Sequence, residues 1–150
     1  MTSTLRCHLR QLSLLLLLSL GPVPAMAAEQ PLPPDEAFKF SATLKGNDTV
    51  VANIILARNH YLYKNKTRFA LKNAKGVMLK EIQLPVGEMK NDPFFGMIEV
   101  YKVPITVTLP LVRSPKAEGL TLLATYQGCN EKLGICYPPT EKTVDLKFTR

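Results

Sequence analysis

The sequence predicts an all-β fold in which two antiparallel sheets pack face to face. Apolar and polar residues alternate in runs of about four to eight residues, which is the period of a half-buried strand. Turn-forming segments at residues 73–76, 85–87 and 114–116 separate these runs. No segment that follows the N-terminal region keeps a helical period for about three turns, which argues against alternating β and α units.

The N-terminal region, residues 1–27, has the pattern of a cleavable export signal. Arg6 and Arg10 precede the apolar run 12–20, and the small-residue site 25–27 follows it. The apolar run is too short to span a bilayer. We therefore expect export into an oxidising compartment, with cleavage after Ala27.

Cleavage would leave residues 28–150 as a single domain, because about 120 residues suffice for one hydrophobic core and not for two. The loss of Arg6 and Arg10 lowers the number of basic residues from 19 to 17 against 12 acidic ones, and the formal charge falls from +7 to +5. The basic residues are spread among strands and turns. A nucleic-acid-binding surface requires a basic stripe with stacking aromatic residues, so the sequence argues against that function.

The first elements of the domain follow from proline content and alternation. Residues 30–34, Gln-Pro-Leu-Pro-Pro, predict an extended lead-in, and one helical turn is expected near 35–37. Residues 38–44 alternate Phe, Phe, Ala and Leu with polar side chains and form a strand with its aromatic residues on one face. After a turn at 46–48, the β-branched run 50–57 is apolar on both faces, which suits a central strand.

Short strands at such spacing indicate an immunoglobulin-like antiparallel β-sandwich. The remaining strands are expected at residues 61–63, 68–72, 77–84, 97–101, 105–109, 120–126 and 143–148.

Two cysteines lie in the connection between the last two predicted strands. Cys129 and Cys136 are the only cysteines that would remain after export, since Cys7 lies in the export signal. Residues 130–134 supply turn chemistry, including a glycine that can take positive φ, so the cysteines are expected on the two arms of a small hairpin. Opposed residues on such arms have Cα atoms about 4.5–5.5 Å apart, which a disulfide accepts.

The cysteine pair alone leaves three functions open. A disulfide that only stabilises a structural or adhesion-type sandwich is the commonest use of such a pair in exported proteins. A redox-active pair is the second possibility. A periplasmic copper carrier is the third, with the two cysteines, His60 and a methionine such as Met89 or Met97 as soft ligands, although the sequence holds no tight Met/His cluster.

Two groups of aromatic residues add to these observations. Phe94 and Phe95 lie in a turn-rich loop between polar residues, so at least one of them is expected to face away from the core, where it would cover or bind something. Tyr61 and Tyr63 alternate with Leu62, which places both tyrosines on one face of a strand. They could line a site or pack with a hydrogen-bonded hydroxyl.

The cysteine segment 126–139, Tyr-Gln-Gly-Cys followed after a short loop by Cys-Tyr-Pro-Pro, resembles the N-terminal periplasmic domain of the thiol:disulfide interchange protein DsbD. The similarity covers the whole exported chain and includes the lead-in 32–40, the segment 61–63 and the loop 92–96. Four matches in the family's order are more specific than cysteine spacing alone. The resemblance implies an immunoglobulin-like relay domain that acts as a protein-disulfide reductase in the periplasm.

The resemblance also implies partners. A thioredoxin-like donor domain would reduce the cysteine pair, which would then reduce a DsbC-like isomerase and a CcmG-like cytochrome c maturation protein. No cofactor or metal is expected, because the sulfurs themselves carry the electrons. The sequence ends at Arg150 without a transmembrane or thioredoxin-like domain, so we expect an excised domain or a free-standing relative, with membrane contact only through the missing domain.

The resemblance assigns roles to the two sulfurs. Cys136 corresponds to the cysteine that forms the mixed disulfide with either partner, and Cys129 corresponds to the resolving cysteine. The loop between them has six residues rather than the five of the best-known pattern, and Pro93 stands where a second acidic residue can occur.

The remaining roles carried over from the family surround the sulfurs. Phe94, with Phe95 beside it, corresponds to the cap that shields the disulfide until a partner displaces it. Asp92 corresponds to an acidic residue of the cap loop, whose charge would disfavour the thiolate. Tyr61 and Tyr63 correspond to residues that line the site.

Overall fold

The computed structural model describes residues 29–149, and antiparallel strands make up nearly all of its regular structure. The predicted export signal lies outside the described residues. Within the described residues, the short helix α2 (Pro34–Ala37) precedes the strands. Pro34 begins this helix rather than continuing the extended lead-in, because the first position of a helix needs no backbone N–H donor.

The first sheet has the strand order β1-β2-β8-β5. β1 (Phe38–Lys45) and β2 (Thr49–Leu56) form a hairpin, and β2 lies between β1 and β8 (Ile105–Arg113). This central position agrees with the prediction from the β-branched run. β1 and β5 (Val77–Leu79) form the two edges of this sheet.

The other strands form two ladders that share one continuous segment of chain. The order β12-β9-β4 joins β12 (Thr140–Lys147), β9 (Gly119–Tyr126) and β4 (Arg68–Lys72). β9 continues after only Gln127 into β10 (Gly128–Asn130).

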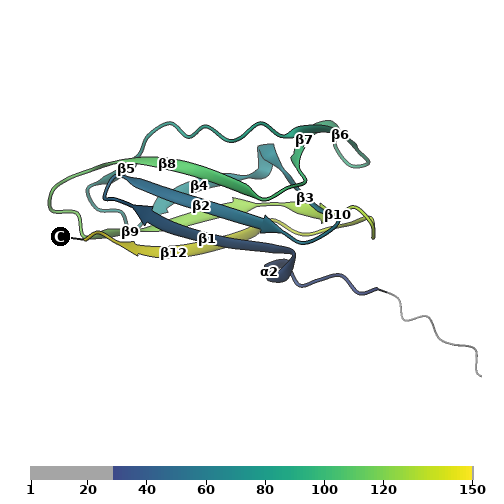
Figure 1. The fold of residues 1–150 in the computed structure, drawn as a ribbon, viewed down its shortest axis with the longest axis horizontal. Helices are drawn as coiled ribbons and strands as arrows, with labels where there is room; N and C mark the ends of the chain where they lie inside the picture. Colours follow the sequence, from purple (N-terminus) through teal and green to yellow (C-terminus); the bar gives the residue numbers. More distant parts are fainter. Residues whose placement is uncertain (1–28, 150) are drawn as a thin grey trace, which may run out of the picture. The chain divides into compact units, whose positions relative to one another are not determined.

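β10 belongs to a five-stranded ladder of order β11-β10-β3-β7-β6. The 3₁₀ turn η1 (Lys64–Lys66) links β3 to β4, so the two ladders are joined at this point as well. Figure 1 shows β10, β3, β7 and β6 gathered at one end of the strands, with the C-terminus at the other. The other strands of this ladder are β11 (Ile135–Cys136), β3 (His60–Tyr63), β7 (Gly96–Tyr101) and β6 (Glu88–Asp92).

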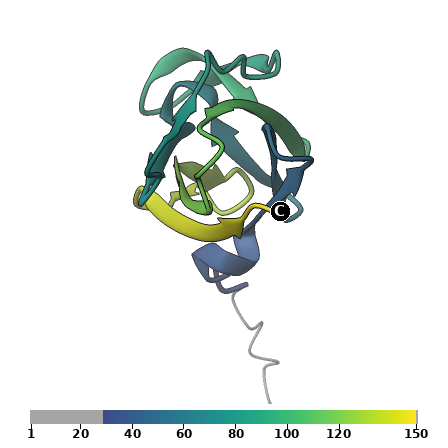
Figure 2. The same ribbon diagram turned by 90° about the vertical axis from the view of Figure 1, so that its left-hand side faces the viewer.

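The main core lies between the first sheet and the β12-β9-β4 ladder, and Figure 2 shows the strands arranged around this interior. The inward positions of β1, starting with Phe38, alternate with exposed ones, as the sequence predicts. β2, β8 and β9 contribute mainly aliphatic residues. Leu62 joins this core from β3 and so fixes the strand that carries the two tyrosines.

Several strand predictions require correction. β8 continues to Arg113 rather than ending at residue 109, and β12 begins at Thr140 rather than at residue 143. The strand predicted at 77–84 ends at Leu79. The backbone N–H of Lys80 still bonds to the carbonyl of Pro110 (2.9 Å), but Pro110 has no N–H to return, so the ladder stops there. β6 was not predicted, because Glu88–Asp92 has no apolar alternation; its pairing with β7 defines it. None of the helices in the described part of the chain has the length and hydropathy that crossing a bilayer requires.

Candidate functional site

The two cysteines face each other on the predicted hairpin. β10 and β11 pair antiparallel with Cys129 opposite Cys136, and a disulfide joins the two sulfurs. Gly128 and Tyr137 form the neighbouring pair of opposed residues, and in this pair the N–H of Tyr137 donates to the carbonyl of Gly128 (2.9 Å). The cysteines therefore occupy a non-hydrogen-bonded pair, where opposed Cα atoms lie closest. Their Cα atoms are 3.9 Å apart, closer than the sequence-based expectation.

The turn of this hairpin uses the residues that the sequence suggests. The side-chain oxygen of Asn130 accepts a hydrogen bond from the N–H of Leu133 (3.0 Å). Gly134 takes a φ of 65°, a region that favours glycine. The six residues between the cysteines thus form a tight connection that keeps the arms in register.

The two sulfurs differ in their access to solvent. Cys129 is 1% exposed, whereas Cys136 is only partly buried. β10 lies so close to β3 that a side chain at Gly128 would place its Cβ 2.2 Å from the carbonyl oxygen of Tyr61. This close approach holds Cys129 inside the ladder and leaves Cys136 on its edge strand.

Tyr61 and Tyr63 lie beside the disulfide, as predicted. Both tyrosines are buried in a small cluster with Cys129 and Val100, while Leu62 points to the main core. The hydroxyl oxygen of Tyr63 lies 3.1 Å from Sγ of Cys129 and 3.7 Å from Sγ of Cys136. One phenol therefore contacts both sulfurs.

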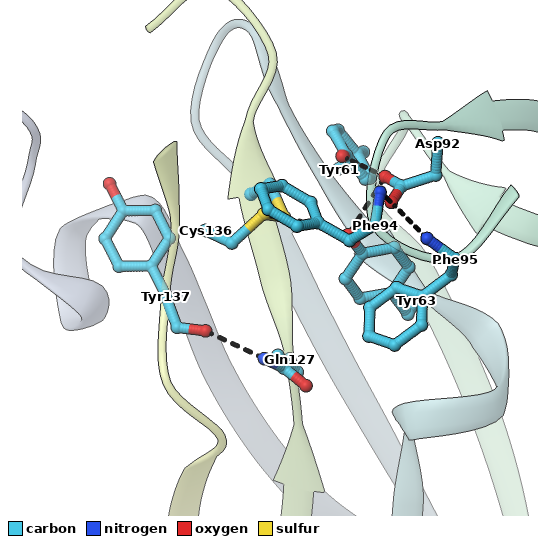
Figure 3. Close-up of a disulfide and its surroundings, with 9 residues drawn as sticks. Tyr61, Tyr63, Asp92, Phe94, Phe95, Gln127, Cys136 and Tyr137 are labelled. Carbon is cyan, nitrogen blue, oxygen red and sulfur yellow. Dashed lines mark hydrogen bonds between the residues drawn. A yellow bond between two sulfur atoms is a disulfide. The ribbon is translucent and has the colours of Figure 1, made fainter. Parts of the chain in front are cut away.

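Asp92 forms the polar centre of the site. It ends β6 and is 3% exposed. Its Oδ2 accepts hydrogen bonds from the hydroxyls of Tyr61 (2.5 Å) and Tyr63 (2.9 Å), and its Oδ1 accepts the backbone N–H groups of Phe94 (2.9 Å) and Phe95 (3.1 Å). The carboxylate thus joins the turn that carries Phe94 and Phe95 to the two tyrosines (Figure 3).

These hydrogen bonds fix the charges of the three groups. Burial by itself would raise the pKa of Asp92, but the hydrogen bonds, led by that from Tyr61, outweigh burial and lower this pKa below 3.8. Burial and, after it, the hydrogen bond to Asp92 raise the pKa of Tyr61. Burial also raises the pKa of Tyr63. At neutral pH the site therefore holds one carboxylate and two protonated phenols.

Phe94 and Phe95 are exposed, with 63% and 48% of their surface open to solvent. The ring of Phe95 packs edge-on against Tyr63, with ring centres 5.1 Å apart, and the ammonium of Lys66 lies 5.2 Å from the centre of the Phe95 ring. In Figure 3 the side chain of Phe94 points from the turn toward the disulfide. The expectation that at least one phenylalanine faces away from the core is confirmed.

An ion pair connects the cap hairpin β6–β7 to the cysteine hairpin. Lys90 of β6 pairs with Glu131, and its ammonium also lies 5.0 Å from the centre of the Tyr61 ring. Lys102 lies 3.6 Å from the other carboxylate oxygen of Glu131. The hairpin turn that follows Cys129 is thus attached to the strand that carries Asp92.

The structure does not bring the ligands of the copper hypothesis together. Within residues 29–149 no group of three or more His, Cys, Asp or Glu side chains is placed to hold a metal ion. Both ring nitrogens of His60 lie at hydrogen-bonding distance from protein atoms, and Met89 and Met97 are exposed on the cap hairpin. The observed geometry therefore gives this alternative no support.

Sequence reasoning did not assign the residues outside the disulfide that hold the two arms of the cysteine hairpin together. The side-chain amide of Gln127 donates to the carbonyl of Tyr137 (3.1 Å), which ties the two arms together next to the cysteines (Figure 3). His60 contacts Asn130 and Tyr137. The sequence did hold one signal for these contacts, because a polar residue, Asn130, directly follows Cys129 and an aromatic residue, Tyr137, directly follows Cys136.

The arrangement defines how an opened disulfide would behave. The hydroxyl of Tyr63 has one proton, which it donates to Asp92, so its oxygen presents lone pairs to Cys129. A Cys129 thiol could donate to that oxygen, whereas a thiolate would gain no donor. The nearby negative charge of Asp92 acts in the same direction. If the disulfide opened, these contacts would therefore stabilise the Cys129 thiol relative to its thiolate.

The sequence matches the family described as thiol:disulfide interchange protein DsbD, N-terminal, over residues 28–147. It is 37% identical over 112 residues to thiol:disulfide interchange protein DsbD 1 of Pseudomonas aeruginosa, covering 75% of this chain and 18% of that protein. It is 36% identical over 122 residues to DsbD of Escherichia coli K12, covering 81% of this chain and 20% of the relative. The chain therefore spans about a fifth of the length of these curated relatives.

Two solved structures from Neisseria meningitidis are also similar. The reduced form of a DsbD N-terminal domain aligns with a TM-score of 0.67 and 33% identity, over 77% of this chain and 89% of that one. A complex of the DsbD N-terminal domain with the PilB N-terminal domain aligns with a TM-score of 0.60 and 30% identity, over 79% of this chain and 88% of that one.

Proposed function

The chain belongs to the family of DsbD N-terminal domains, and on this premise we propose that it relays electrons between proteins by opening and closing the Cys129–Cys136 disulfide. The observation that best supports the proposal is the unequal burial of the two sulfurs in a site that contains a buried carboxylate and phenols. A disulfide that only stabilises the sandwich needs neither feature. The disulfide also lies outside the main core, at one end of the strands.

The reduction half of the proposed cycle begins at the accessible sulfur. A donor thiolate attacks Sγ of Cys136, the S–S bond breaks, and Cys129 leaves with the electron pair. A proton from solvent then converts this thiolate to the thiol that the Tyr63 oxygen accepts. The second thiol of the donor, as thiolate, attacks the donor sulfur of the mixed disulfide and releases Cys136. The donor dithiol becomes a disulfide, and the domain gains two electrons and one proton, with Cys136 released as the thiolate.

The oxidation half reverses these roles. The thiolate of Cys136 attacks the disulfide of an acceptor protein, forms a mixed disulfide and releases one acceptor thiol. Cys129 then loses its proton and attacks Sγ of Cys136, which reforms the internal disulfide and releases the second acceptor thiol. Cys129 is suited to this resolving role because its buried position keeps it away from solution thiols while it remains opposite Cys136.

The cap and Asp92 are proposed to restrict this reaction to suitable partners. Thiolate attack requires an in-line approach to the sulfur. Phe94 points toward the disulfide and would block that approach until a docking protein displaces it. Asp92 holds the backbone of the cap turn through two N–H groups and favours protonated Cys129 through Tyr63.

The partners and compartment follow from family membership. We propose a thioredoxin-like donor domain as the source of electrons, and a DsbC-like isomerase and a CcmG-like maturation protein as acceptors, all in the periplasm after removal of residues 1–27. The related complex with a PilB N-terminal domain supports a protein partner at this domain. The cycle needs no metal or organic cofactor.

A trapping experiment tests the proposal. The Cys129→Ala variant has lost its own resolving thiol. Mixed with a thioredoxin-like domain that lacks its second cysteine and carries its remaining sulfur as a mixed disulfide with a small aromatic thiol, it should release that small thiol and give a covalent adduct through Cys136 that reductant dissolves. The matched Cys136→Ala variant keeps only the buried sulfur and should give little adduct. Peptide mapping by mass spectrometry identifies the linked cysteine.

The alternatives predict other results. An inert structural disulfide is not opened by a reduced thioredoxin-like domain, so the native chain stays oxidised when that domain is added. A copper carrier binds Cu(I) tightly and loses that binding when either cysteine is replaced. Absence of any adduct, with both variants folded by circular dichroism, would refute the relay function.

A further inference from the structure

His60 is a buried side chain that the proposed exchange does not use. It begins β3 and is 4% exposed. Its ring packs edge-on against Phe38, with centres 5.6 Å apart, and lies 5.7 Å from the ring of Tyr137. It lies on the strand that carries Tyr61 and Tyr63, and therefore between the main core and the cysteine hairpin.

Both ring nitrogens of His60 have defined partners. Nδ1 lies 2.8 Å from the carbonyl oxygen of Arg58, which can only accept, so Nδ1 carries a proton. Nε2 of the neutral ring is then an acceptor. It lies 3.3 Å from the amide nitrogen of Asn130 and 3.1 Å from the hydroxyl of Tyr137.

The orientation of the Asn130 amide is fixed independently. Its oxygen accepts the N–H of Leu133 (3.0 Å), which leaves the NH₂ group facing His60. The single proton of the Tyr137 hydroxyl has two acceptors within reach, the carbonyl of Leu32 (3.0 Å) and Nε2 of His60, and it can be donated to one of them at a time. Asn130 and Tyr137 are both buried, and within residues 29–149 no buried side-chain polar atom lacks a partner.

The positions of these two partners in the sequence matter. Asn130 directly follows Cys129 on β10, and Tyr137 directly follows Cys136 at the end of β11. One imidazole nitrogen therefore contacts the residue after each cysteine, one on each arm of the hairpin. The His60 ring thus links the two arms noncovalently, in addition to the covalent link that the disulfide provides.

That connection gains importance when the disulfide opens. β11 has two residues and forms the edge of its ladder, so β10 is its only strand neighbour in the described part of the chain. Besides the Asn130–Ile135 pair, the arms are then held by the N–H of Tyr137 on Gly128, by the Gln127 amide on Tyr137, and by His60. His60 and Tyr63, both on β3, contact both arms; Tyr63 does so at the sulfurs, and His60 does so at the residue that follows each cysteine.

We propose that His60 is a positioning residue that keeps the two thiols opposed in the reduced hairpin and thereby sets the reduction potential of the pair. The inference rests on the proposed function, since a potential matters only for a disulfide that exchanges. Closure of a dithiol depends on the effective concentration of one thiol at the other, which rises when the arms cannot separate. A looser hairpin closes less readily, so its disulfide is easier to reduce and its potential is less negative.

The test measures the equilibrium between the disulfide and glutathione, in the full chain with Cys7→Ser so that only one pair exchanges. Two glutathione thiols reduce the pair and form one glutathione disulfide, and alkylation followed by mass spectrometry gives the reduced fraction. His60→Phe keeps a ring against Phe38 and removes both nitrogens. It should lower the equilibrium constant for closure about tenfold, which corresponds to about 30 mV.

A second variant and two controls complete the design. Tyr137→Phe retains the ring and removes one arm of the connection, so it should shift the potential in the same direction, and its effect should not add fully to that of His60→Phe. His60→Gln supplies a carbonyl acceptor and should restore part of the shift. Tyr126→Phe is the matched control, because its hydroxyl is also buried and bonds to the Phe38 carbonyl (3.4 Å) without touching the hairpin.

The outcomes separate this inference from the proposed function. Unchanged potentials in both His60→Phe and Tyr137→Phe overturn the role of His60 while exchange itself persists. An equal shift in Tyr126→Phe also overturns it, since general destabilisation then accounts for the result. A disulfide that no glutathione ratio reduces in the unaltered protein contradicts the relay function instead.

Discussion

The phenolic oxygen of Tyr63 lies 3.1 Å from Sγ of Cys129, and its proton is directed to Asp92 rather than to the sulfur. A carboxylate is a far stronger acceptor than a disulfide sulfur, so this direction is expected. The carboxylate thereby acts on the sulfur through an intervening hydroxyl as well as through its charge. Both effects can be tested by substitution.

Asp92→Asn should lower the pKa of Cys129 in the reduced protein, because it removes a negative charge and frees the Tyr63 hydroxyl to donate to a thiolate. The pH dependence of alkylation in a Cys136→Ala background measures this pKa. Glu131→Gln, which removes an exposed carboxylate of the hairpin turn, is the matched control. An unchanged or higher pKa in the Asp92 variant would contradict the proposed effect on the sulfur.

The stability of the fold should depend on the ionisation of Asp92. Its pKa in the folded protein lies below the unfolded value of 3.8, so its contribution is present above pH 3.8 and is lost as pH falls through the folded pKa. Asp92→Asn should cost about 1–3 kcal/mol at pH 7, because it weakens charged hydrogen bonds in a buried site.

Urea unfolding between pH 5 and pH 2 measures the acid part of this effect. The pKa values of Glu99 and Glu131 are also lowered, chiefly by hydrogen bonds from lysines, so the wild type has several acid-sensitive groups. The slope of unfolding free energy against pH should be smaller in Asp92→Asn. Equal slopes in the two proteins would show that Asp92 does not contribute.

Phe94→Ala should speed the reduction of the disulfide by small thiols several-fold, since the side chain that points toward the sulfurs is removed. The rate of reduction by dithiothreitol under pseudo-first-order conditions provides the measurement. Val103→Ala removes an exposed apolar side chain from the loop after β7 and should leave the rate unchanged. An equal rate in Phe94→Ala and wild type would remove the shielding role.

Gly128→Ala should destabilise the fold by about 3 kcal/mol or more. Its Cβ would lie 2.2 Å from the Tyr61 carbonyl oxygen and 2.7 Å from the Phe38 ring, so two strands would have to separate. Gly134→Ala has open space around it and should cost about 1–2 kcal/mol, through its positive φ alone. Chemical denaturation compares the two variants, and similar losses would argue against close packing at Gly128.

The sequence predicted those parts of the fold that depend on local pattern. Alternation located most strands, and the glycine at position 134 indicated the turn of the cysteine hairpin. Tyr61 and Tyr63 were placed on one face because the period of a strand is fixed. The resemblance to a known family then directed attention to Asp92, which composition alone does not distinguish from any other acidic residue.

The features that were missed depend on contacts between distant segments. Strand β6 is polar and is defined by its partner β7, while β5 ends early because Pro110 lies on the neighbouring strand. The contacts of His60 with Asn130 and Tyr137 span 70 and 77 residues. Such pairs become visible only when the fold has brought them together.

The order of strands in the site ladder places β11 and the cap strand β6 at opposite edges, with β3 in the middle. Only residues 93–95 separate β6 from β7, and they contribute no strand pairing to the cysteine hairpin. The tip proposed to select partners and the sulfurs proposed to carry electrons therefore lie on different hairpins of one ladder. Under the proposed function, replacing residues 93–95 with another loop should change which proteins exchange electrons with the Cys129–Cys136 pair while the pair itself stays the same.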